Sequence, residues 1–182
     1  EKIGVNWRSM YYHPVLKAMM MVYVDDFMLS GAQKSCDAAW KLLRQDITME
    51  DPDKVNKCLG VNHVVSQRTL ANGRKVNVCN WDMNDFARQC VERYLALCPG
   101  AKLRRATPPF LDEALLNNSR GKPGTLTAVA SAVLMKILYC ARYVRFDLLK
   151  PIQVLATQVT KWDEACDRAL HKLVCYIHSC PS

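Results

Sequence analysis

The chain has 182 residues, of which 50 % are hydrophobic and 23 % are charged, so it can bury one sizeable core or two smaller ones. Its 25 Lys and Arg residues outnumber its 17 Asp and Glu residues, and the net charge of +8 favours an anionic partner such as nucleic acid, although a soluble basic domain can carry the same surplus. The apolar run Met19–Val24 is far shorter than the ~20 residues of a membrane-spanning helix, so we expect neither a membrane span nor a secretory leader.

The first half of the chain predicts an antiparallel sheet followed by a helix. Residues 6–12 and 15–29 have the composition of strands in a meander, and His13-Pro14 interrupts the pattern between them. Residues 34–45 place apolar side chains at helical spacing. The Asp51-Pro52-Asp53 segment then indicates a turn.

A hairpin and a second helix are predicted next. Residues 59–65 and 75–78 form the expected strands, and Asn72-Gly73 between them is a strong turn signal. Asp82 is the expected cap of a helix over residues 83–97.

The C-terminal part predicts helices only. Residues 101–124 are rich in Pro, Gly and Asn and predict a linker, and helices are expected over 125–143, 147–159 and 163–178. The prediction is therefore an α+β fold: an antiparallel sheet with helices over residues 1–100, a linker over 101–124, and a small all-helical unit over 125–182.

The Tyr23-Val24-Asp25-Asp26 segment carries the clearest chemical signal. It lies between the apolar runs 15–22 and 27–29, so two strands joined by almost no loop would hold both carboxylates at a rigid tip. Adjacent carboxylates suit Mg²⁺, and phosphoryl or nucleotidyl transfer uses two such ions about 4 Å apart. A solvated acidic turn is the alternative interpretation.

Cysteine and histidine residues leave another alternative open. The nine cysteines are an odd number that cannot pair completely within the chain, so we expect reduced thiols in an intracellular, non-secreted protein. Near the C-terminus, five Cys and His residues are candidate zinc ligands, although a buried helix face would show a similar pattern and the spacing matches no common zinc finger. They are Cys166, His171, Cys175, His178 and Cys180.

The order of these features resembles the reverse transcriptase of copia-type LTR retrotransposons over nearly the whole chain. The matching segments are the Tyr-Val-Asp-Asp hairpin with Ser30-Gly31, the helix 36–44, Leu59-Gly60-Val61, the strands and helix 65–97, Thr107-Pro108, and the helical stretch 130–179. The chain departs from the family pattern at three positions: Cys58 stands where an aromatic residue is usual, Phe146 replaces the proline of an Arg-Pro-Asp motif, and Ile177 follows Tyr176 where the family has leucine.

The resemblance implies a fold and roles for particular residues. It implies the C-terminal part of a polymerase palm, with its catalytic hairpin and primer grip, followed by a helical region similar to a thumb or connection. The implied catalytic and metal-binding residues are Asp25 and Asp26, with Mg²⁺ or Mn²⁺ as the cofactor. The implied nucleotide and primer contacts are Tyr23, Val24, Leu59, Gly60 and Val61; Lys54 and Lys57 are candidate general acids, and Lys102, Arg104 and Arg105 are candidate phosphate contacts.

The implied function is RNA-directed DNA polymerisation by two-metal nucleotidyl transfer in an intact parent protein. Its partners would be an RNA or DNA template-primer, a deoxynucleoside triphosphate and the rest of a Pol polyprotein, in a cytoplasmic particle or the nucleus and without a membrane. The family's first metal-binding aspartate belongs to an earlier strand that does not fit before Val15, so we expect a fragment of the polymerase. A catalytically inactive nucleic-acid-binding remnant and a helical interaction module are the alternative functions.

Overall fold

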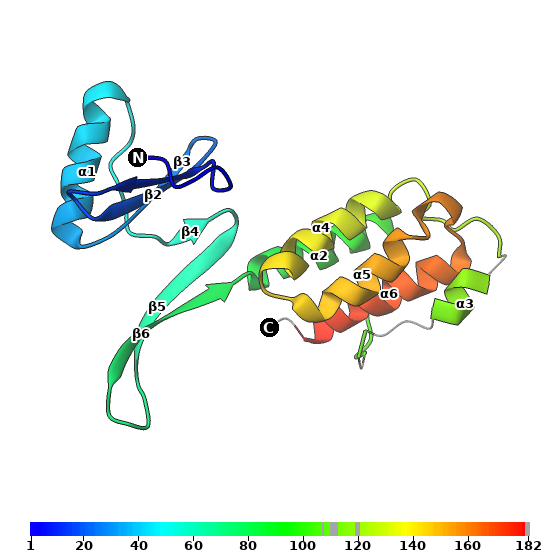
Figure 1. Ribbon diagram of the computed structural model, residues 1–182. Coiled ribbons are helices and arrows are strands. Elements are labelled where there is room, and N and C mark those ends of the chain that lie inside the picture. Colours follow the sequence, from blue (N-terminus) through cyan, green and yellow to red (C-terminus); the bar gives the residue numbers. More distant parts are fainter. Residues whose placement is uncertain (107, 110–112, 119–120, 181–182) are drawn as a thin grey trace. The chain divides into compact units, whose positions relative to one another are not determined.

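The computed structural model describes residues 1–106, 108–109, 113–118 and 121–180 (Figure 1). Of the expected Thr107-Pro108 step, Thr107 lies outside these residues. The chain divides into two compact units, Glu1–Asn56 and Lys57–Ser182, and each is described by itself below. Antiparallel sheets in both units and helices in the C-terminal part confirm the predicted α+β class.

The first unit is a three-stranded antiparallel meander followed by a helix. Its strands are β1 (Met10–His13), β2 (Ala18–Tyr23) and β3 (Asp26–Ser30), in that spatial order, and its helix is α1 (Gln33–Asp46). The predicted strand over residues 6–12 begins later than expected, because residues 4–9 are mostly turns.

Helix α1 covers one face of this sheet. Met20 pairs with Tyr11 on one side and Leu29 on the other, and residues that pair directly project to the same face. Together with Ala39 and Leu43 of α1, these side chains line a 220 Å³ cavity. The alternate residues of β2, Met19, Met21 and Tyr23, therefore belong to the face opposite α1.

The second unit begins with a long hairpin. Strands β4 (Lys57–Cys58), β5 (Val61–Thr69) and β6 (Lys75–Asp82) form an antiparallel sheet in chain order. The hairpin expected between residues 59 and 78 is confirmed, but both strands are longer than predicted. Its connecting loop includes Gly73, whose φ of +78° favours glycine.

Helices dominate the described residues that follow β6 in the second unit. They include α2 (Asn84–Leu97), α3 (Glu113–Asn118), α4 (Ala130–Tyr143), η1 (Phe146–Leu148), α5 (Leu149–Ala156), η2 (Val159–Lys161) and α6 (Glu164–Ser179). The N-cap residue of α2 is Met83 rather than the expected Asp82, because the helix begins one residue later than predicted. The Asp82 carboxylate nevertheless accepts a hydrogen bond from the backbone N–H of Asn84 (2.8 Å), the first residue of the helix. None of the helices in the described part of the chain has the length and apolar character to cross a membrane.

The helices surround a shared hydrophobic core. Helix α2 packs against α4 and α6, and α5 packs against the same two helices (Figure 1). Leu134, Ile137, Leu155, Leu170 and Leu173 are among the fully buried side chains of this core. The boundary between the two compact units therefore lies between Asn56 and Lys57, not in the linker expected over 101–124. The reason is that α2 packs its buried face against the C-terminal helices.

The chain before α4 is attached to the beginning of α6. Asp163 caps α6 by accepting a hydrogen bond from the Cys166 N–H (3.0 Å). One helical turn later, the Asp167 carboxylate accepts from the Thr125 N–H (2.6 Å) and hydroxyl (2.9 Å), from the Leu126 N–H (3.3 Å) and from the Trp162 indole N–H (2.7 Å). Thr125 and Leu126 are therefore bound to the helices of the second unit rather than part of a free connection.

Candidate metal-binding site

The Tyr23–Asp26 segment forms the tight hairpin that the sequence predicts. Tyr23 pairs with Asp26 across strands β2 and β3, so only Val24 and Asp25 remain in the turn. Val24 has a φ of +53°, whereas Asp25 does not have a positive φ. A positive φ at the first central residue alone is typical of a type II′ turn, in which that position is normally glycine. A β-branched residue there indicates local backbone strain.

Both carboxylates are exposed at this tip. Tyr23 and Asp26 share the sheet face opposite α1, because they pair directly and follow the alternation from Met21. Tyr23 is 54 % exposed and Val24 is 78 % exposed, so the tip is accessible to a large ligand. Hard carboxylate oxygens with open solvent around them fit Mg²⁺, which keeps several water or phosphate ligands. Within the described residues, however, no group of three or more His, Cys, Asp or Glu side chains gathers into a metal site.

The strain at Val24 leads to a prediction about stability. We expect Val24→Gly to stabilise the hairpin by about 0.5–1 kcal/mol, because the strain that is relieved, about 1–2 kcal/mol, exceeds the entropic cost of glycine. Native-state hydrogen exchange of the β2 and β3 amides measures this as slower exchange. Val15→Gly is the matched control, since Val15 is also exposed (83 %) but has no positive φ; it should speed exchange. Faster exchange in Val24→Gly would contradict the strain interpretation.

The Leu59-Gly60-Val61 segment forms a second tight turn, in the second unit. Cys58 pairs with Val61, and both residues between them have a positive φ, +50° for Leu59 and +77° for Gly60, which is the pattern of a type I′ turn. Val61 is 2 % exposed and belongs to the hydrophobic core, so the turn is fixed at its base.

A tyrosine of helix α4 holds this turn. The Tyr139 hydroxyl donates a hydrogen bond to the Leu59 carbonyl (2.5 Å), and the Tyr139 ring lies 5.3 Å from the Phe86 ring and 5.2 Å from the Tyr143 ring, measured between centroids. Tyr139 was not among the predicted site residues. It lies 80 residues from Leu59, and no local pattern in the sequence indicates the contact.

The candidate basic residues are all exposed. Lys54 lies in the segment after α1, and Lys57 begins β4 opposite Asn62. The segment with Lys102, Arg104 and Arg105 runs alongside the C-terminal end of α6. The Arg104 N–H donates to the Cys175 Sγ (3.5 Å), and the Ala106 N–H donates to the Ser179 hydroxyl (3.1 Å). The backbone of this segment is thus bound to the helices while its cationic side chains face solvent.

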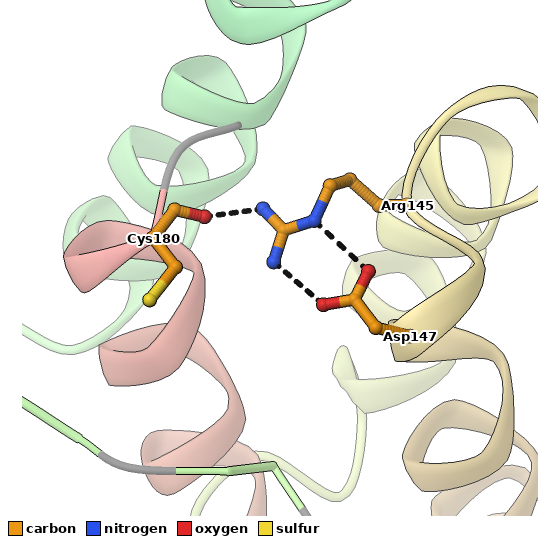
Figure 2. A network of polar contacts seen from close by, with 3 residues as sticks. All are labelled: Arg145, Asp147 and Cys180. Atoms are coloured by element: carbon orange, nitrogen blue, oxygen red, sulfur yellow. Dashed lines mark hydrogen bonds and ion pairs between the residues drawn. The ribbon is translucent and has the colours of Figure 1, made fainter.

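Arg145 and Asp147 form a structural ion pair. Arg145 donates through Nε and a terminal nitrogen to the two carboxylate oxygens of Asp147 (3.0 and 2.8 Å), and its other terminal nitrogen donates to the Cys180 carbonyl (Figure 2). The guanidinium also lies 5.5 Å from the Tyr176 ring centroid. Arg145 is 7 % exposed. The pair therefore joins the start of η1 to the end of α6.

The candidate zinc ligands do not converge. Cys166 and Cys180 lie at opposite ends of α6, which separates them by about 21 Å along the helix axis. His171 is bound through Nδ1 to the Tyr94 hydroxyl (3.0 Å) and through Nε2 to the Cys175 Sγ (3.4 Å). Burial raises the pKa of the Cys166 thiol, which disfavours the thiolate that zinc requires.

The predicted catalytic residues and the predicted primer contacts lie in two turns, whereas the five basic candidates lie outside them. Tyr23, Val24, Asp25 and Asp26 lie together in the first unit, and Leu59, Gly60 and Val61 lie together in the second. Comparisons of the chain with protein-family models, curated proteins and solved structures found no match. Evidence about function therefore comes from these residues and their geometry.

Proposed function

We propose that the chain is a fragment of a copia-type reverse transcriptase, in which the β2–β3 hairpin supplies part of a two-metal nucleotidyl-transfer site. The observation that carries this proposal is the exposed two-residue turn, which places Asp25 in the turn and Asp26 directly after it. Backbone strain at Val24 supports it, because strained residues concentrate at functional sites. The order of motifs along the chain gives further support.

The roles proposed for the hairpin residues are those that the resemblance implies. Asp25 and Asp26 would hold Mg²⁺ or Mn²⁺, and a further aspartate of the intact polymerase would complete the ligand set. The bound ions would lower the pKa of the primer 3′-hydroxyl and neutralise charge on the leaving pyrophosphate. Tyr23, on the same face as Asp26, would position the primer end or the incoming nucleotide.

The second turn supports a role in holding the primer. The Leu59-Gly60 turn is held by the hydrogen bond from Tyr139 and by the buried Val61 that follows it. A rigid turn is suited to orienting a primer strand, since misplacement of reacting atoms by about 1 Å can cost 10²-fold in rate. Lys54 and Lys57 are the proposed general acids because the resemblance implies that role, and Lys102, Arg104 and Arg105 are the proposed phosphate contacts because they are cationic and exposed.

Metal binding by the chain itself is the first test. We expect Mn²⁺ to broaden the NMR signals of residues 23–27 selectively, and Asp25→Asn/Asp26→Asn to abolish this effect while the sheet stays intact. Asp46→Asn/Asp53→Asn is the matched control, because it removes the same charge from exposed positions of the same unit outside the hairpin. Equal broadening of both variants would show diffuse attraction of the cation and would contradict a site at the hairpin.

Primer extension tests the activity. A chimaera that carries the upstream palm segment of a copia-type reverse transcriptase ahead of Glu1 should extend a primer on an RNA template with Mg²⁺. The same chimaera with Asp25→Asn/Asp26→Asn should lose this activity, and Asp46→Asn/Asp53→Asn should retain it. A chimaera that binds primer-template but never extends it would favour the inactive nucleic-acid-binding remnant, and one that does neither would reject the polymerase proposal.

A further inference from the structure

The β5–β6 hairpin is exposed to an unusual extent. Every residue from Val64 to Lys75 is exposed, so over this stretch neither face of the two strands is covered by the helices of the same unit. Figure 1 shows the strands extending from the start of α2 with their connecting loop far from the helices. An isolated two-stranded hairpin is at best marginally stable, which makes an external partner for this surface a reasonable expectation.

The base of the hairpin is nevertheless fixed. Val61 at the start of β5 is 2 % exposed and Met83, directly after β6, is 3 % exposed, and both belong to the hydrophobic core. The rings of His63 and Trp81 meet edge to face, with centroids 5.9 Å apart. The hairpin is therefore a projecting arm with a rigid attachment.

Apart from Asp82 at the end of β6, the charge of the arm has one sign. Residues 57–81 contain no Asp or Glu, but they contain Lys57, Arg68, Arg74 and Lys75. The last three lie at or beside the connecting loop, and all of them are exposed. Such a surface complements a polyanion.

One face of the arm also carries neutral hydrogen-bonding groups. Gln67 pairs directly with Asn77, and Thr69 pairs with Lys75, so these side chains project to the same face. Carboxamides of Asn and Gln can form paired hydrogen bonds with the exposed edge of adenine in the major groove of DNA. This face thus combines groups that can contact bases with a cation that can contact phosphate.

We infer that the β5–β6 arm binds duplex DNA by lying in its major groove, with Arg68, Arg74 and Lys75 on the phosphates. The paired strands, about 5 Å apart, fit a groove about 12 Å wide, which admits a two-stranded ribbon. The deep and narrow major groove of an RNA duplex does not admit side chains in this way. The choice of nucleic acid over other polyanions rests on the proposed function.

The inference is tested by measuring how the full chain binds a labelled DNA duplex. EDTA in the buffer removes divalent metal ions, so the proposed metal site cannot contribute to binding. Arg68→Ala/Arg74→Ala/Lys75→Ala should lower the affinity at least 10-fold at low salt and reduce the slope of log K against log salt by about 3, one for each lost phosphate contact. Arg142→Ala/Lys161→Ala/Arg168→Ala is the matched control, since it removes three exposed charges from the helical part of the same unit; its affinity should stay within about twofold of wild type.

The outcomes separate the alternatives. Equal losses in both triple variants would show that net charge alone binds DNA, and equal affinity for heparin or an RNA duplex would show non-specific polyanion binding; either result would overturn the inference. Gln67→Ala/Asn77→Ala, which leaves the charge unchanged, should reduce the preference for DNA over RNA duplexes. Far-UV circular dichroism checks that each variant is folded. DNA binding that depends on the arm, together with failure of the chimaera in primer extension, would support this inference while favouring the inactive nucleic-acid-binding remnant over the polymerase.

Discussion

Replacing Asp167 by alanine is expected to lower the free energy of unfolding of the second unit by about 3–4 kcal/mol. The carboxylate accepts hydrogen bonds from Thr125, Leu126 and the Trp162 indole, and hydrogen bonds to a charged group contribute about 1.5–3 kcal/mol each. Trp162 is only 3 % exposed, so alanine would leave its N–H buried without a partner. Because these contributions are not additive, we expect less than their sum. Urea unfolding followed by circular dichroism measures the change.

Two variants separate the hydrogen bonds from other effects of the substitution. Asp167→Asn retains the size of the side chain and one acceptor, and it should cost about half as much as alanine. In the Trp162→Phe background, which lacks the indole N–H, Asp167→Ala should cost about 1 kcal/mol less than in wild type. A loss below about 1 kcal/mol for Asp167→Ala in wild type would show that water replaces the carboxylate at this site.

Replacing Arg145 by alanine is expected to destabilise the same unit by about 3 kcal/mol. Removal of one partner of a buried ion pair typically costs about 3–5 kcal/mol, and we take the lower end because the Asp147 side chain is 39 % exposed. The variant also loses the hydrogen bond to the Cys180 carbonyl and the contact with the Tyr176 ring (Figure 2). Arg145→Lys is the control for charge: it cannot form the two-pronged contact, so it should recover less than half of the loss.

The same ion pair predicts a dependence of stability on pH. The hydrogen bonds that Asp147 accepts from Arg145 lower the pKa of the Asp147 carboxyl below the usual value of 3.8. A group whose pKa is lower in the folded state contributes stability above its unfolded pKa and loses that contribution as the pH falls through the folded pKa. The difference in unfolding free energy between wild type and Asp147→Asn should therefore be constant above about pH 5 and shrink below pH 3.8. A difference that persists at pH 2 would show that packing, not charge, stabilises this contact.

The helices were predictable because apolar residues recur along the sequence at helical spacing. Residues 163–178 place apolar side chains at helical spacing, and α6 occupies Glu164–Ser179. The length of the β5–β6 hairpin was not predictable in this way. Hydrophobic alternation marks a strand only where one face is buried, and Ser66–Thr69 have neither face covered.

For the candidate site, the sequence predicts the Tyr23–Asp26 turn but not the backbone strain at Val24, nor the hydrogen bond by which Tyr139 holds the Leu59-Gly60 turn. The apolar runs on either side of Tyr23–Asp26 indicate a tight hairpin, and the register confirms it. The positive φ of Val24 contradicts the preference of a β-branched residue, so no propensity rule predicts it. The Tyr139 hydrogen bond to Leu59 and the packing of α2 on the C-terminal helices are long-range contacts, which the composition of the 101–124 segment does not reveal.

The sparse core of the first unit has a consequence for ligand binding. Across residues 1–56, all of which the structure describes, only Ala18 and Ala39 are buried hydrophobic residues. Two alanines contribute little to stability, so this unit has a small reserve of folding free energy. A ligand present at 100 times its dissociation constant stabilises the folded form by about 2.7 kcal/mol, which is large on this scale. Whatever binds the carboxylate hairpin should therefore also determine how much of the unit is folded, so that occupancy and order rise together.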